Sequence, residues 1–177
     1  MISGPRREAY NSAHHPSAQE RMPRISSPLQ RTIAFVRILT AVIFILFGQY
    51  KLFTPAFAHG GFEQYVSGFV QSQAVGFYKG FLSAVVLPHP VLFGYMVGLV
   101  EIVIGVCLLV GFWVRAASVL GALHMLSLTL ATWWGPGHGA PIWQYFGAEL
   151  DHIPLLFLFV IFFAANSGQT WGVDGHR

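Results

Sequence analysis

The apolar run from Val91 to Gly111 limits the possible folds of this chain more than any other feature, and Glu101 is its only charged residue. Roughly 20 apolar residues, rising about 1.5 Å each, cross a bilayer hydrocarbon core about 30 Å thick. The whole chain is 54% hydrophobic and 10% charged, whereas soluble domains carry about 25% charged residues. The run therefore predicts a transmembrane helix.

Glu101 falls near mid-membrane, where a carboxylate costs about 2.5–3.5 kcal/mol unless another group solvates it. At about 100° per residue, Gly94, Gly98 and Gly105 share the helix face of Glu101. Small residues allow a neighbouring helix to approach closely. We therefore expect Glu101 to face the interior of a helix bundle and not the lipid.

Three further apolar segments are long enough to cross the membrane, the last one with help from its flanks. They cover Thr32–Phe53, Val114–Trp134 and Ile153 to about Gly168. Only Phe112 and Trp113 separate the second span from the third, which makes these two helices antiparallel neighbours. The predicted fold is all-α, a four-helix transmembrane bundle.

The segment between the first and second spans, residues 54–90, is mixed in character. Phe62, Tyr65 and Phe69 recur at helical spacing, and so do Tyr78 and Phe81. This spacing favours an amphipathic helical segment that lies along the membrane interface with its aromatic side down. The alternative is a loop that packs over the mouth of the bundle.

The predicted membrane domain covers residues 31–170. Residues 1–30 are rich in Ser, Pro, Arg and His without a period, which is typical of a disordered tail. Translation starts at Met1 or Met22, and the sequence leaves both open. Residues 171–177 form a second, short tail.

Lysine and arginine predict the orientation in the membrane. Arg115, Arg177 and the arginines before the first span fall on one side, whereas Lys51 and Lys79 fall on the other. Both termini are therefore expected to be cytoplasmic. We interpret the N-terminal arginines as part of this cytoplasmic tail and not as an arm that binds nucleic acid. They are Arg6, Arg7, Arg21, Arg24 and Arg31.

Arg37 is the predicted partner of Glu101. Both charges lie inside predicted spans, an axial gap of about 7 Å separates them, and the guanidinium fork fits a carboxylate. His124, near mid-depth on the third span, completes the predicted intramembrane polar cluster of Arg37, Glu101 and His124. The alternatives are a structural clamp that fixes helix register, and a neutral His124 bonded to a backbone or hydroxyl group.

A second candidate ligand site is predicted near the outer face, and its expected residues are Lys51, Asp151 and His152. We expect the Lys51 amine to extend toward the outer surface. The histidines of the chain match no compact metal motif, and the heights of His124 and His152 disagree with paired haem ligation. We predict no metal site. With Cys107 as the single cysteine, the chain has no intrachain disulfide and no Cys-ligated cluster.

Several of these residues form short motifs in a fixed order. The first span carries Arg37 and Gly48-Gln49-Tyr50-Lys51-Leu52, and the second carries Gly98-Leu99-Val100-Glu101. Gly105 follows, and Gly111-x-x-x-Arg115-Ala116-Ala117 then leads into the third span. In these motifs the chain resembles the DoxX family of four-helix membrane proteins, over about residues 31–170.

The resemblance implies a multi-pass protein of the bacterial inner (plasma) membrane with cytoplasmic ends. The family includes DoxD, a subunit of thiosulfate:quinone oxidoreductase, and the chain is also similar to membrane proteins that support maturation of methylamine dehydrogenase. The chain departs from the enzyme subunit because it lacks a fused soluble domain and has a long amphipathic outer loop.

Two functional hypotheses follow. The first is a membrane subunit of a quinone-linked redox system, which binds quinone in an apolar pocket and meets a soluble or membrane redox partner. Lys51, Asp151 and His152, or the deeper Arg37 and Glu101, would hold the quinone oxygens. The second hypothesis is a non-enzymatic scaffold or assembly factor for a partner protein. The sequence leaves open whether the chain is enzymatic, and it does not define the electron donor or the oligomeric state.

Overall fold

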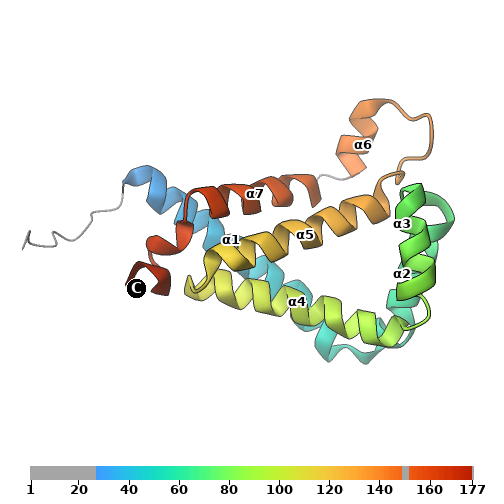
Figure 1. Cartoon of the computed structure of the whole chain (residues 1–177), viewed down its shortest axis with the longest axis horizontal. Helices are drawn as coiled ribbons and strands as arrows, with labels where there is room; N and C mark the ends of the chain where they lie inside the picture. The colour runs from blue at the N-terminus through green and yellow to red at the C-terminus, as the bar shows by residue number, and fades with distance from the viewer. Residues whose placement is uncertain (1–26, 149–151, 177) are drawn as a thin grey trace, which may run out of the picture.

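The structure, a computed structural model, describes residues 27–148 and 152–176. Every regular element in these ranges is a helix. The four apolar helices are α1 (Pro28–Phe53), α4 (Pro90–Val110), α5 (Val114–Thr132) and α7 (His152–Ala164), as Figure 1 shows. The first three are long and apolar enough to cross a membrane, whereas α7 has 13 residues. The all-α prediction is confirmed, and the chain carries three membrane-capable helices within the described ranges.

Helix α1 begins earlier than the apolar pattern indicates. The Ser27 hydroxyl accepts a hydrogen bond from the Gln30 amide, and the Gln30 side chain accepts one from the Ser27 amide. This capping box, with Pro28 in the first turn, starts the helix inside the segment assigned from sequence to the disordered tail. Residues 1–26, the remainder of that predicted tail, lie outside the described residues.

A tight turn joins α4 to α5. Gly111 ends α4 in the left-handed region at φ 71°, a conformation that suits glycine, and α5 begins at Val114. The two helices are antiparallel neighbours, as predicted. After α7, short 3₁₀ turns at Ser167–Gln169 and Val173–His176 lie at the end of the molecule where α1 begins (Figure 1).

The segment between α1 and α4 is helical, as predicted, and folds over the opposite end of the bundle (Figure 1). It contains α2 (Phe62–Gly68) and α3 (Gly76–Phe81), interleaved with π-helical turns at Phe57–Gly61, Phe69–Gln73 and Leu82–Val86. Its buried side chains pack against Ala131 near the end of α5. The Val75 amide also donates a hydrogen bond to the Leu130 carbonyl. The segment, which we call the helical cap (residues 57–86), therefore covers that end of α5.

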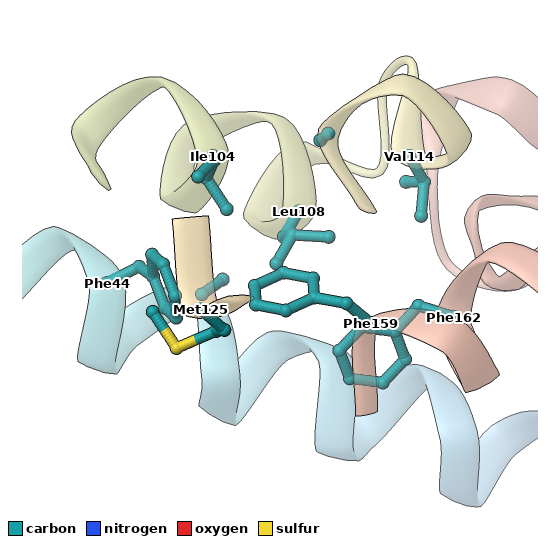
Figure 2. Close-up of a cluster of buried hydrophobic side chains, with 9 residues drawn as sticks. Phe44, Ile104, Leu108, Val114, Met125, Phe159 and Phe162 are labelled. Carbon is teal, nitrogen blue, oxygen red and sulfur yellow. The ribbon is translucent and has the colours of Figure 1, made fainter. Parts of the chain in front are cut away.

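A short helix, α6 (Ile142–Ala148), follows the cap-side end of α5. The main core lies between α1, α4, α5 and α7, and each of these helices contributes to it (Figure 2). Phe44 and Phe159 meet edge to face with ring centroids 5.2 Å apart, a favourable arrangement for aromatic rings. The buried side chains labelled in the figure are Phe44, Ile104, Leu108, Val114, Met125, Phe159 and Phe162.

Candidate functional site

Close packing of α1 against α4 fixes how the two helices are aligned. A Cβ atom added at Gly48 would lie 2.9 Å from the Gly98 carbonyl oxygen. A Cβ added at Gly105 would lie 3.0 Å from the Ala41 carbonyl oxygen. The backbones therefore touch along the small-residue face of α4. Glu101 lies on this face and is buried, which confirms that it faces the bundle interior.

The alignment brings Lys51 to Glu101. Gly98 lies beside the Lys51 Cβ, one helical turn before Glu101, and the Lys51 Nζ is 2.5 Å from Glu101 Oε1. The side chains of Lys51 and Glu101 are 17% and 6% exposed. Lys51 was expected to extend toward the outer surface. It turns inward instead, because an intramembrane carboxylate is a better partner for its amine than lipid is.

His124 of α5 is the second partner of Glu101. Its Nε2 lies 3.2 Å from the same Oε1 atom, and its ring packs edge to face with Phe44. The other carboxylate oxygen, Oε2, is buried and has no hydrogen-bond partner within the described part of the chain. Lys51, Glu101 and His124 thus form one cluster from three helices, which we call the Glu101 cluster. One of its acceptor atoms is unused by these partners.

Arg37 does not belong to this cluster, so the predicted Arg37–Glu101 pair is wrong. Arg37 is fully buried, and its Nη2 donates to the backbone carbonyls of Thr170 and Trp171 at 3.4 and 3.2 Å. The alignment of α1 with α4 places the guanidinium beside Gly111. Gly111 is ten positions from Glu101, or about 15 Å at 1.5 Å per residue, about twice the expected gap.

Asp174, which no sequence pattern singled out, organises the segment that binds Arg37. Its Oδ1 accepts a hydrogen bond from the Trp113 amide at 3.0 Å, and its Oδ2 accepts one from the Val114 amide at 2.9 Å. Its own amide donates to the Gly111 carbonyl at 2.9 Å. Residues 170–174 therefore clasp the α4–α5 turn, and we call them the C-terminal clasp. The dipeptide Asp174-Gly175 is a turn signal that could have indicated this fold.

A cavity of about 470 Å³ lies beside the Glu101 cluster. Lys51, Glu101 and His152 supply its polar wall, and the His152 Nδ1 lies 3.4 Å from the Thr132 hydroxyl oxygen. The remaining wall is largely apolar and comes from α1, α5 and α7. Its side chains include Ile43, Phe44, Phe47, Met125, Leu128 and Leu155.

Residues from two sites that were predicted separately thus line the same cavity. Glu101 comes from the predicted intramembrane cluster, and Lys51 and His152 come from the predicted outer-face site. Asp151, the third member of the outer-face prediction, lies outside the described residues. Arg37 lies at the other end of α1, in the C-terminal clasp.

The cavity combines an ion pair with apolar walls. Lys51 is a donor, Glu101 Oε2 is an acceptor, and imidazole groups can act as either. Such a site suits a ligand with a few oxygen atoms on an apolar body. Among the described residues, no group of three or more His, Cys, Asp or Glu side chains is arranged to hold a metal ion.

Apolar helices of membrane-spanning length, packed around a buried ion pair, define a multi-pass integral membrane protein. The family model for DoxX matches residues 32–134, more than half of the chain, and the chain belongs to the DoxX family. The comparisons with curated proteins and with solved structures gave no match. The matched region contains the whole Glu101 cluster, whereas His152 and the C-terminal clasp follow it.

Proposed function

We propose that this protein is a membrane subunit of a quinone-linked redox system and that it binds a quinone in the cavity beside the Glu101 cluster. The observation that carries the proposal is an apolar cavity of about 470 Å³ with Lys51, Glu101 and His152 on its wall. Small-molecule pockets typically enclose about 300–1,000 Å³ and pair apolar walls with a few polar groups.

The polar atoms fit the headgroup of a quinone. A quinone carbonyl accepts a hydrogen bond, which the Lys51 ammonium can donate, whereas a quinol hydroxyl donates one, which Glu101 Oε2 can accept. Oε2 is buried without a partner in the described structure, and a bound hydroxyl would offset the cost of leaving it so. Phe44 and Phe47 supply aromatic surface for the ring.

Reduction of a quinone takes up two electrons and two protons and yields a quinol. In the proposal, the electrons come from a partner oxidoreductase, soluble or membrane-bound, and the chain binds and orients the quinone. Cys107 is the only cysteine, so no intrachain thiol pair carries the electrons to the quinone. The buried carboxylate of Glu101 stands where a proton would enter or leave the headgroup.

In the proposed topology, α7 is the fourth span, and both termini face the cytoplasm of a bacterial cell. Two features support it: the start of α1 and the C-terminal clasp lie at one end of the bundle (Figure 1), and Arg31 and Arg115 belong to that end. Fusions of a periplasm-active and a cytoplasm-active reporter to each terminus test it. Reporter activity on opposite sides for the two termini would overturn it.

The quinone site is tested by titrating the purified protein with a short-chain ubiquinone analogue, in its oxidised form and in its reduced quinol form, and measuring both dissociation constants. Glu101→Gln should weaken binding of the quinol form at least tenfold, because loss of one buried charge-assisted hydrogen bond from the quinol hydroxyl costs about 1.5–3 kcal/mol. Ile43→Phe should also weaken binding, because it narrows the cavity without touching the ion pair. Glu63→Gln changes an exposed carboxylate of α2 and serves as the control.

Equal quinone and quinol affinities in the wild-type protein, Glu101→Gln and Ile43→Phe would reject this cavity as the site.

A second candidate function is a membrane scaffold or assembly factor. It is favoured by the exposed aromatic side chains of the helical cap, where Tyr65 and Phe77 are 63% and 72% exposed. Co-purification of a partner that is lost in Phe77→Ser but retained in Glu101→Gln would favour the scaffold.

A further inference from the structure

A groove on the exposed apolar surface runs between α5 and α7. It encloses about 310 Å³ and is almost wholly apolar. Ser118 and Ala122 are its small residues, and they leave room between larger neighbours. Its flanking side chains include Leu126 from α5 and Leu156, Val160 and Phe163 from α7. Phe159, one of the core residues in Figure 2, also lines the groove. The groove shares no lining residue with the cavity of the Glu101 cluster.

A second hollow adjoins one end of this groove. It encloses about 580 Å³, and its lining includes Trp113, Arg115, Asn166 and Gln169. The guanidinium carbon of Arg115 lies 4.4 Å from the centroid of the Phe163 ring. Because Arg115 lines the hollow and Phe163 lines the groove, the two spaces meet at this cation–π contact.

The charges of the hollow favour an anion at Arg115. Asp174 also lines the hollow, but each of its carboxylate oxygens accepts a backbone amide hydrogen bond at the start of α5, and the charge of Arg37 attracts it. Arg115 is exposed and forms no ion pair with a carboxylate in the described structure. The positive charge is therefore available, whereas the negative charge is already compensated.

We propose that the groove and the hollow together form a binding site for one anionic phospholipid. Its phosphate binds the Arg115 guanidinium, whose planar donors suit phosphate oxygens. One acyl chain lies along the groove between α5 and α7. Snorkelling alone would account for an arginine at a helix end, but it does not account for an apolar groove that starts at its aromatic partner.

The surroundings match the membrane depth that this lipid needs. Trp113 is 61% exposed beside Arg115, and tryptophan is enriched at the level of the lipid headgroups. Helix α7 has 13 residues, or about 20 Å, which is shorter than the hydrocarbon core of about 30 Å. A helix shorter than the hydrocarbon core is accommodated by local thinning of the bilayer, which brings the lipid phosphates closer to the level of Arg115. The inference is independent of the proposed quinone site.

Native mass spectrometry of the full-length protein in mild detergent tests the proposal. The protein is titrated with phosphatidylglycerol and with phosphatidylcholine that carries the same acyl chains. The wild-type protein should bind one phosphatidylglycerol about fivefold more tightly, as expected for one basic residue at a membrane surface. Arg115→Gln should abolish this preference, and Arg31→Gln, outside the groove, should retain it.

A groove-filling variant tests the acyl-chain half of the site. Ala122→Leu should weaken the binding of both lipids, because the larger side chain occupies the groove and leaves Arg115 unchanged. It also provides a test if Arg115→Gln fails to fold, which circular dichroism would reveal. A wild-type protein without a lipid preference, or an Arg115→Gln variant that keeps it, would overturn the proposal. So would unchanged lipid binding by a folded Ala122→Leu variant.

Discussion

The Lys51 amine lies 2.5 Å from the carboxylate of Glu101, and the two residues come from antiparallel helices whose glycines touch. The pair depends on this contact, because Gly98 brings the stem of Lys51 within one turn of Glu101. A bulkier residue at either Gly48 or Gly98 would separate the helices and lengthen the distance from amine to carboxylate. Packing of small residues and pairing of charges are therefore one structural feature in this protein.

The first prediction concerns the free-energy coupling between Lys51 and Glu101. Lys51→Ala leaves the buried carboxylate without its nearest cation, so the single variant should be strongly destabilised. Adding Glu101→Ala should recover part of the loss, with a coupling of about 1–3 kcal/mol. The measurement is thermal unfolding of the wild-type protein, the two single variants and the double variant in detergent, monitored by size-exclusion chromatography. A double variant whose loss equals the sum of the two single losses would contradict the pairing.

The second prediction concerns the contact of α1 with α4. Gly48→Ala should destabilise the protein by about 1–3 kcal/mol, because the new Cβ would lie 2.9 Å from the Gly98 carbonyl oxygen. Gly80→Ala is the matched control, since no atom lies within 4 Å of a Cβ added there. The measurement is the apparent melting temperature in detergent. Equal melting temperatures for the two variants would show that α1 and α4 are not in close contact.

The third prediction concerns the C-terminal clasp. Asp174→Ala should cost about 1–2 kcal/mol, because two backbone amides at the start of α5 lose their acceptor. Residues 170–176 should then become sensitive to a protease, which mass spectrometry of the cleaved protein would detect. Glu63→Ala, on the exposed face of α2, should cause no such cleavage. Unchanged protection in Asp174→Ala would show that the clasp holds by other contacts.

The fourth prediction separates Arg37 from the quinone site. Arg37→Gln removes the guanidinium that donates hydrogen bonds to the carbonyls of Thr170 and Trp171, so it should loosen the C-terminal clasp. Quinone affinity should change less than twofold, because Arg37 does not line the cavity of the Glu101 cluster. Proteolysis and quinone titration of the same preparation measure both effects. A tenfold loss of quinone affinity without clasp cleavage would favour the Arg37–Glu101 pair instead.

The fifth prediction tests the packing of α5 against α7. An alanine at Gly121 would clash with the ring of Phe159, so Gly121→Ala should lower the melting temperature. The second change Phe159→Leu should restore part of the loss, because leucine is smaller at the point of contact. Phe159→Leu alone should destabilise the protein, since it leaves a cavity in the core. No recovery in the double variant would contradict this contact.

The sequence was sufficient to predict which side of α4 is buried. Glu101 shares a face with glycines, and the 3.6-residue period places that face toward another helix without knowledge of the neighbour. The motifs also indicated the family, which the match over residues 32–134 shows. Both inferences depend on local spacing within one segment.

The sequence did not reveal how far each helix is shifted along its neighbour. Sliding one helix along another leaves the spacing of residues within each helix unchanged. Arg37 and Lys51 share one face of the first span, so spacing alone does not decide which of them meets Glu101. The backbone contact of Gly48 with Gly98 decides between them. The acceptors of Arg37 also could not be predicted from the sequence, because they are backbone carbonyls that any residue type supplies.

The burial of Arg37 also bears on how the protein is made. Its two acceptors lie 133 and 134 residues further along the chain, and N-terminal segments are synthesised first. While the ribosome is still translating the later helices, α1 must therefore tolerate an unsatisfied guanidinium within the bilayer or remain partly in the translocon. Synthesis of residues 170 and 171 supplies the two acceptors of the Arg37 Nη2 atom, so the first helix gains these hydrogen bonds only after the last segment of the chain has been made.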